Sequence, residues 1–194
     1  MLIVAGLLLA TNPGSGKSTV FPVAGFGVEY FNADDRAAAL NLGSYLRIPQ
    51  TIRRQVNGMF EAFVHDCIER RISFALETTL RSAVTFEQAA MAKRAGFETE
   101  MRYLALDDFA QHLERVKIRA DNGGHSAPEP VLRAIYEASL RNLPRAIREM
   151  DSISVYDNGR FDSSLRVLLE AERGNIVYMA ERVPPWMVRT LREL

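Results

Sequence analysis

Short apolar runs alternate with longer, partly polar segments along the first 160 residues of this chain. Apolar runs of four to eight residues bounded by polar residues are typical of buried β-strands. When such strands alternate with helical segments, the pattern predicts an α/β domain with a mostly parallel sheet flanked by helices. The five strands are predicted at Leu2–Leu9, Val28–Asn32, Ile72–Glu77, Glu98–Leu106 and Ser152–Tyr156.

The segments between these strands carry apolar residues three and four positions apart, as in helices with one buried face. The clearest example is TIRRQVNGMFEAFVHDCIERR, residues 51–71. A proline inside a helix removes one backbone hydrogen bond, so Pro144 should kink the helix that contains it. The other helices are predicted at Ser82–Arg94, with Gly96 as the stop, at Asp108–Asp121 and from Pro128 to Met150.

The end of the chain has a different pattern. The run LRVLLEAERGNIVYMAE predicts an appended β-hairpin that turns around Arg173–Asn175, and Pro184–Leu194 predicts a short terminal helix. There is no internal repeat and no linker-like stretch. We therefore expect residues 1–194 to form one domain.

The first apolar run leads into TNPGSGKST, residues 11–19. In loops of the form GxxxxGK[ST], backbone N–H groups surround nucleotide phosphates, the lysine reaches the outer phosphates and the next hydroxyl binds Mg²⁺. Thr11 replaces the first glycine, and Pro22 leaves little room for the helix that usually follows. The alternative is a Gly/Ser loop with an incidental lysine. The predicted nucleotide-binding residues are Pro13, Gly14, Ser15, Gly16, Lys17, Ser18 and Thr19, with Ser18 as the Mg²⁺ ligand.

Acidic residues follow the second and third predicted strands, at the edge where ligands bind in open α/β sheets. In VEYFNADDRAA, Asp34 is the candidate general base, and Asp35 is a helix cap or a solvated neighbour of a helix that starts at Arg36. In ISFALETTLR, Glu77 and Thr78 are candidates for binding a substrate hydroxyl. Glu77 could instead bind Mg²⁺ through water. The alternative for this second cluster is helix capping by Thr79 or Ser82.

A fourth polar run, LERVKIRADNGGHSAPE, combines arginines with a glycine pair. Arg115 and Arg119 are four residues apart and share a helix face, so they could clamp a transferring phosphate from a segment that the glycines allow to move. A solvated charged face is the alternative. His125, in the glycine-rich loop, is a candidate substrate contact. His65 and His112 lie on predicted helices without metal-ligand partners, and the sequence gives them no role.

Composition narrows the class of protein. Lys+Arg and Asp+Glu both number 24 in the 194 residues, so no net charge recruits nucleic acid or an anionic membrane. The single cysteine, Cys67, excludes an intramolecular disulfide and is typical of a reducing compartment. No apolar run reaches the roughly 20 residues of a membrane span. We expect a cytoplasmic protein.

Together, GSGKST, FNADD, FALETTLR, ERVKIRADNGGHSAPE, YEASLRNL and VYDNG resemble the zeta toxin family and related small P-loop ATPases, in the family's order over residues 1 to 160. The resemblance implies an adenylate-kinase-like P-loop kinase. Zeta toxins use ATP or GTP with Mg²⁺ to phosphorylate UDP-N-acetylglucosamine and are inhibited by an antitoxin. The resemblance also implies that Arg81 binds phosphate. It places Asn142 and Asn158 in family motifs without giving them a role.

The motifs leave the acceptor open, because toxin and non-toxin branches share them. A kinase for another metabolite, and a nucleotide-binding signalling module without efficient transfer, are the alternatives. Relatives commonly read LIVAGPNGSGKST, whereas here LLLATNP precedes GSGKST. Either the first strand is longer, or residues 6 to 26 are remodelled.

Overall fold

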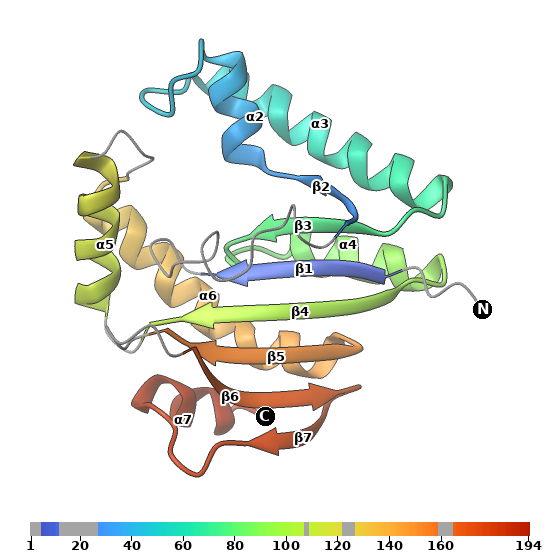
Figure 1. Cartoon of the computed structure of the whole chain (residues 1–194), viewed down its shortest axis with the longest axis vertical. Helices are drawn as coiled ribbons and strands as arrows, with labels where there is room; N and C mark the ends of the chain where they lie inside the picture. The colour runs from blue at the N-terminus through green and yellow to red at the C-terminus, as the bar shows by residue number, and fades with distance from the viewer. Residues whose placement is uncertain (1–4, 12–26, 107–108, 122–126, 159–164) are drawn as a thin grey trace.

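A computed structural model describes residues 5–11, 27–106, 109–121, 127–158 and 165–194, with the backbone alone for residues 5–11 and 119–121. Within these residues the strands form one sheet in the order β2-β3-β1-β4-β5-β6-β7 (Figure 1). The strands are β1 Ala5–Thr11, β2 Glu29–Phe31, β3 Phe74–Thr78, β4 Glu98–Ala105, β5 Ser152–Asp157, β6 Arg166–Glu172 and β7 Asn175–Met179.

The first five strands pair in parallel, as predicted, with β1 between β3 and β4. Leu8 of β1 is level with Leu76 on one side and Met101 on the other. β1 continues through Thr11, which is level with Leu104. The first strand is therefore longer than the predicted Leu2–Leu9 at its carboxyl end, and all five strands end at one edge of the sheet.

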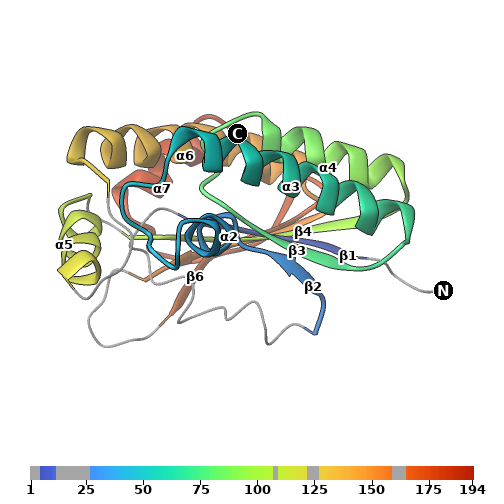
Figure 2. The same ribbon diagram turned by 90° about the horizontal axis from the view of Figure 1, so that it is seen from above.

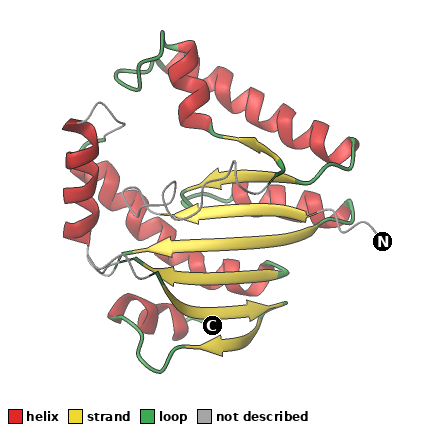
Figure 3. Ribbon diagram, in the orientation of Figure 1, coloured by secondary structure: helices red, strands yellow, loops and turns green. Residues whose placement is uncertain are grey.

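The helices are α2 Ala33–Leu40, α3 Gln50–Glu69, α4 Val84–Arg94, α5 Phe109–Asp121, α6 Glu129–Glu149 and α7 Pro185–Leu191. Figure 2 shows α3, α4 and α6 together on one side of the sheet. By contrast, α5 lies beyond the carboxyl ends of the strands, and α2 continues from the end of β2 at the outer edge of the sheet (Figure 3). The predicted stop at Gly96 is confirmed: this glycine has a φ of +86°, and the Phe97 N–H donates to the Ala92 carbonyl at 3.0 Å.

Two predicted helix starts are wrong. α4 begins at Val84 and has no side-chain cap, so neither Thr79 nor Ser82 caps it. α2 begins at Ala33 rather than Arg36, because the side chain of Asn32 accepts the N–H groups of Asp34 and Asp35 at 3.0 and 3.2 Å. Asn32 is therefore the cap that the sequence had assigned to Asp35, and both aspartates lie in the first helical turn.

Aromatic side chains fix β2 against the rest of the fold. Phe31, which is 3% exposed, lies 5.4 Å from Phe60 and 5.5 Å from Phe63 of α3, measured between ring centroids. Phe63 in turn contacts Phe74 of β3. Burial of an aromatic side chain stabilises by about 1.5–3 kcal/mol, so this cluster holds the three-residue strand against α3 and β3.

The predicted hairpin is confirmed, and it extends the parallel sheet. β6 pairs antiparallel with β5, and β6 and β7 are joined at Arg173 and Gly174, whose φ values of +49° and +79° are typical of a tight two-residue turn. Leu168 and Leu169 of β6 and Trp186 of α7 are fully buried. The C-terminal segment thus contributes to the main core.

A polar network joins α4, β4 and the start of β5. The Asp151 carboxylate accepts the Thr99 N–H and hydroxyl, both at 2.8 Å, and lies 3.0 Å from the Lys93 ammonium. Burial alone would raise the pKa of Asp151, but the hydrogen bonds from Thr99 and the contact with Lys93 outweigh it and lower the pKa. None of the described helices has the length and apolar character needed to cross a bilayer.

Candidate active site

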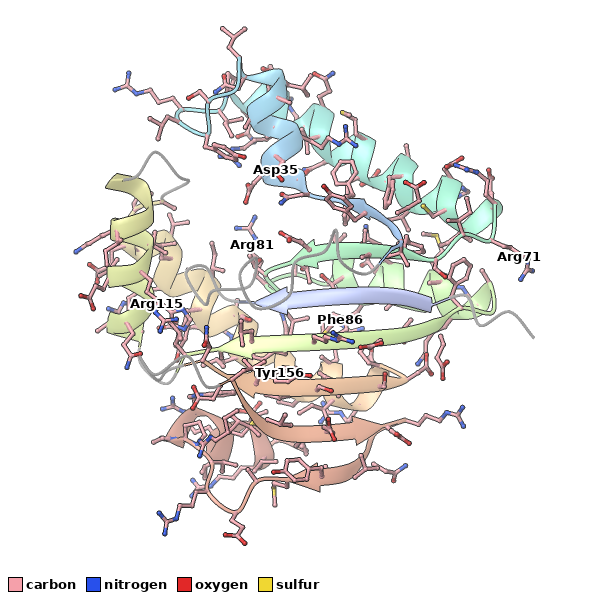
Figure 4. All side chains as sticks on the ribbon, viewed as in Figure 1. Asp35, Arg71, Arg81, Phe86, Arg115 and Tyr156 are labelled. Atoms are coloured by element: carbon pink, nitrogen blue, oxygen red, sulfur yellow. The ribbon has the colours of Figure 1, made fainter. Side chains whose placement is uncertain are left out.

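The carboxyl ends of the parallel strands bring several predicted site residues to one edge. Figure 4 shows Arg81 after β3, Arg115 on α5 and Asp35 at the start of α2, next in sequence to the predicted base Asp34, on the side of the sheet where the strands end. Ligands of open α/β sheets bind outside the carboxyl ends of the strands. The topology therefore brings segments that are far apart in sequence to the position expected for a nucleotide and its acceptor.

The predicted phosphate loop lies outside the described residues. Pro13, Gly14, Ser15, Gly16, Lys17, Ser18 and Thr19 remain predictions, as do the effects of Pro22 and the assignment of Ser18 to Mg²⁺. The described backbone of β1 runs through Thr11. This favours a longer first strand as the reason for the unusual LLLATNP sequence, and it brings the chain to the carboxyl edge immediately before the loop.

Asp34 and Asp35 are both exposed, in the first turn of α2. Asp35 accepts a hydrogen bond of 2.8 Å from the hydroxyl of Tyr45. This bond is the main reason that the pKa of Tyr45 is raised; burial and the negative charges of Asp35 and Asp34 act in the same direction. Tyr45 therefore stays a donor at neutral pH. Sequence reasoning missed Tyr45, which lies in an irregular segment with no motif.

The two carboxylates have different surroundings, although both are exposed. Asp35 lines a cavity of about 830 Å³ together with Arg36 and Ala39, whereas Asp34 is not among the residues that line it. Arg81 and Arg115 do not line this cavity, which borders β2 and the residues before β3.

Glu77 and Thr78 end β3, and Arg81 lies in the turn that follows. Glu77 is half-buried and level with Leu9 of β1, so its carboxylate belongs to the predicted edge. The Thr78 hydroxyl accepts the Leu80 N–H at 3.1 Å and shares a hydrogen bond of 2.8 Å with the Thr85 hydroxyl. The structure thus gives Thr78 a role in holding the turn, alongside its predicted substrate contact. Arg81 is exposed.

Asn142 on α6 contacts the same turn. Its side-chain amide donates to the Leu80 carbonyl at 2.8 Å, across 62 residues of sequence. Leu80 is fully buried and has a φ of +55°, which is unusual for a residue other than glycine. The sequence placed Asn142 in a motif without a role, and no spacing rule could have paired it with Leu80.

α5 is attached to the ends of β4 and β5. Arg115 donates to the Asn158 carbonyl at 3.1 Å. His112, 3% exposed, accepts the Leu106 N–H at 3.3 Å through Nε2, and its ring meets the Tyr136 ring edge-on at 4.9 Å. His112, which had no role in the sequence, therefore anchors α5. The side chain of Arg119 and all of His125 lie outside the described residues, so both assignments remain predictions.

Asp157 is a further acidic residue at this edge. It ends β5, is 8% exposed and lies 3.5 Å from the Arg166 guanidinium. The sequence VYDNG signals it as a polar residue directly after an apolar strand, but only Asn158 had been singled out. In the described part of the chain, no three histidine, cysteine or acidic side chains are grouped as a metal site. The water-mediated contact of Glu77 with Mg²⁺ stays a prediction.

Comparisons with known proteins give a matching family model, a relative in sequence and similar folds. The family model described as Zeta toxin matches residues 44–166. An uncharacterised protein of Haemophilus influenzae is 27% identical over 124 residues, covering 63% of this chain and 86% of that protein.

Two solved structures are similar in fold. The AvrRxo1-ORF1:-ORF2 crystal structure with ATP matches with a TM-score of 0.69 and 16% identity, over 89% of this chain and 59% of that one. This chain therefore spans less than two thirds of that protein's length. A structure from the PezAT toxin-antitoxin system of Streptococcus pneumoniae matches with a TM-score of 0.64 and 13% identity, over 98% of this chain and 85% of that one.

Proposed function

The chain belongs to the zeta toxin family, whose model covers more than half of its residues, and from this premise we propose that it is an ATP- or GTP-dependent kinase for a small hydroxyl compound. Its fold is that of an adenylate-kinase-like P-loop protein, as the sequence predicted, with a mostly parallel sheet and a C-terminal hairpin. Membership of the family and this fold both indicate a phosphotransferase.

One observation carries the proposal. The sheet order puts the end of β1, from which the GSGKST segment continues, beside the ends of β3 and β4. Glu77 lies near the end of β3, level with Leu9, and Asp34 lies in the first turn of α2. Figure 4 shows Asp35, Arg81 and Arg115 on the side of the sheet where these strands end. Phosphoryl transfer depends on positioning and charge stabilisation, and it requires a phosphate cradle, a base and cations around one point. The described residues bring acidic and cationic side chains to this edge, and we propose that the GSGKST segment, which follows β1 in sequence, supplies the phosphate cradle.

The proposed roles follow from the chemistry of each group. Lys17 would bind the outer phosphates, and Asp34 would accept the proton of the attacking hydroxyl. Arg115 and Arg119 would neutralise charge on the transferring phosphate. Mg²⁺ would be held by the Ser18 hydroxyl, with Glu77 contacting its water, because such oxygen donors suit this ion. Glu77, Thr78, Arg81 and His125 would bind the acceptor.

The leading acceptor is UDP-N-acetylglucosamine, since this is the substrate that the family resemblance implies. An antitoxin is the proposed protein partner; the similar PezAT structure comes from a toxin-antitoxin system. We place the protein in the cytoplasm, without nucleic-acid or membrane partners. We also propose that residues 1–194 form one domain, supported by a core cluster that runs from Phe31 to Met187.

A second function has its own supporting observation. Thr11 and Pro22 depart from the usual phosphate-loop pattern, which favours a module that binds nucleotide and signals through a partner without efficient transfer. A kinase for another metabolite is the alternative within the same reaction class.

The test is to incubate the full chain with Mg²⁺, ATP or GTP and a panel of UDP-sugars, and to detect phosphorylated sugars by mass spectrometry. Calorimetry of nucleotide binding is done in parallel. The kinase proposal predicts a product that disappears in Asp34→Asn while nucleotide affinity is retained. Binding without transfer to any acceptor would support the signalling module, and absence of nucleotide binding would refute both.

A further inference from the structure

The turn between β3 and α4 is held in an unusual conformation by side chains from three elements. Leu80 has a left-handed φ of +55° and is fully buried. Backbone strain of this kind costs about 1–3 kcal/mol and persists only where surrounding contacts enforce it. We call the turn and its contacts from Thr78, Thr85 and Asn142 the Leu80 latch.

Both backbone groups of Leu80 are bound by side chains. Its N–H donates to the Thr78 hydroxyl at 3.1 Å, and that hydroxyl is fixed by Thr85 at 2.8 Å. Its carbonyl accepts from the Asn142 amide at 2.8 Å. Thr85 is buried and Asn142 is half-buried. The latch therefore fixes the peptide planes on both sides of Leu80, and with them the direction in which the next residue leaves the backbone.

The next residue is Arg81. Its side chain is exposed and points away from the sheet toward the start of α2 (Figure 4). Within the described residues, its guanidinium makes no hydrogen bond or ion pair. An arginine presents a planar set of donors suited to bidentate contact with phosphate, and such contacts depend on orientation. A turn that only connected β3 to α4 would not need three side chains to hold it in a strained conformation. The direction of the Arg81 side chain gives these contacts a reason.

We propose that Asn142 is a positioning residue: through the Leu80 carbonyl it fixes the turn that aims Arg81 at a phosphate group bound at the carboxyl edge. This inference rests on the proposed function, because it takes the phosphate from the nucleotide or from a UDP-sugar acceptor. Arg81 makes the contact, and Asn142 acts through it without touching the ligand.

The test is a double-mutant cycle on ligand affinity, measured by calorimetry on the full chain. Asn142→Asp keeps the side-chain shape and removes the donor to the Leu80 carbonyl. It is combined with Arg81→Ala and compared with Arg141→Ala, an exposed neighbour on α6. The two probes are ATP with Mg²⁺ and UDP-N-acetylglucosamine, which distinguish the nucleotide from the acceptor as the source of the phosphate. Thr85→Val, which releases the Thr78 hydroxyl, provides a second way to loosen the latch.

We expect Asn142→Asp to weaken binding of one probe by about 3- to 10-fold, the effect of one lost hydrogen bond. Arg81→Ala should weaken the same probe at least as much, the double variant should be no worse than Arg81→Ala alone, and Arg141→Ala should bind as wild type. Hydrogen exchange of residues 79–82 should accelerate in Asn142→Asp and Thr85→Val.

Three results would overturn the inference. The first is unchanged affinity for both probes in Asn142→Asp. The second is an equal loss of affinity from Asn142→Asp in wild type and in Arg81→Ala, and the third is unchanged hydrogen exchange of residues 79–82. The kinase proposal fails separately. If the cycle behaves as expected but no phosphate is transferred to any acceptor, the positioning role stands and the kinase does not. If wild type binds neither probe, both are refuted.

Discussion

Replacing Asp151 should destabilise the fold in a pH-dependent manner. The carboxylate accepts two hydrogen bonds of 2.8 Å from Thr99, whose side chain is fully buried, and it faces Lys93 at 3.0 Å. Asp151→Ala would leave the buried Thr99 N–H and hydroxyl without this acceptor. The Thr99 hydroxyl also accepts the Asp151 N–H at 3.1 Å, so the backbone junction between α6 and β5 would loosen as well.

The magnitude follows from these contacts. Hydrogen bonds to a charged group contribute about 1.5–3 kcal/mol each, and an unsatisfied buried donor costs about 1–3 kcal/mol. The Lys93 side chain is 35% exposed, so solvent screening reduces that ion pair to at most about 1 kcal/mol. We expect Asp151→Ala to lower the free energy of unfolding at pH 7 by about 3 kcal/mol. Asp151→Asn, which keeps one acceptor oxygen, should lower it by about 1–2 kcal/mol.

The pH dependence follows from the lowered pKa of Asp151 in the folded state. A carboxyl whose pKa is lower in the folded than in the unfolded chain stabilises the fold above its ordinary value of 3.8, and this contribution is lost as pH falls through the folded value. Urea denaturation should be followed by circular dichroism at pH 7, 5, 4 and 3. The difference in the free energy of unfolding between wild type and Asp151→Asn should become smaller toward pH 3.

The control is Glu149→Gln, two residues away, whose exposed carboxylate pairs with Arg145 and should contribute less than about 1 kcal/mol. A cost below about 1 kcal/mol for Asp151→Ala at pH 7 would refute the reasoning, as would a difference between wild type and Asp151→Asn that does not change with pH.

Three other substitutions or treatments test different parts of the molecule. Asp34→Asn should reduce phosphoryl transfer by about 100-fold or more, as expected for loss of a general base, whereas Asp35→Asn, whose partner is Tyr45, should reduce it far less; equal losses would reassign the base. Trp186→Ala, at a position 1% exposed, should lower the free energy of unfolding by about 3–5 kcal/mol in urea, and a cost below about 1 kcal/mol would contradict its place in the core. Burial raises the pKa of the Cys67 thiol to about 11, so a thiol reagent at pH 8 should label it quickly in denaturant and slowly in the native protein, and fast native labelling would contradict that burial.

Most of the architecture could be predicted from the sequence, because it depends on local patterns. Apolar runs located all five parallel strands, and helical spacing located the helices between them. Gly96 marked the end of α4, because glycine readily adopts the positive φ found there. Helix starts were harder. Asn32, Asp34 and Asp35 can all cap a helix, and sequence alone does not distinguish them; the structure shows that the Asn32 side chain is the cap.

The candidate site could be predicted only in outline. Residues directly after apolar strands, such as Asp34 and Glu77, are visible in sequence because parallel strands share a carboxyl edge. The groups that hold the edge in place are not visible in this way. His112, Asn142 and Tyr45 act on backbone or side-chain atoms 6, 62 and 10 residues away, and no spacing rule identifies such pairs.

The hairpin at the end of the chain has a practical consequence for anyone trimming the protein. The family model stops at residue 166, where β6 begins, which makes a shorter version attractive for expression. Cutting there would strip Leu168, Leu169, Trp186 and Met187 from the interior and leave β5 as an open border with unpaired amides. Such an edge recruits strands from other molecules, so the region defined by shared motifs is smaller than the unit that can remain in solution.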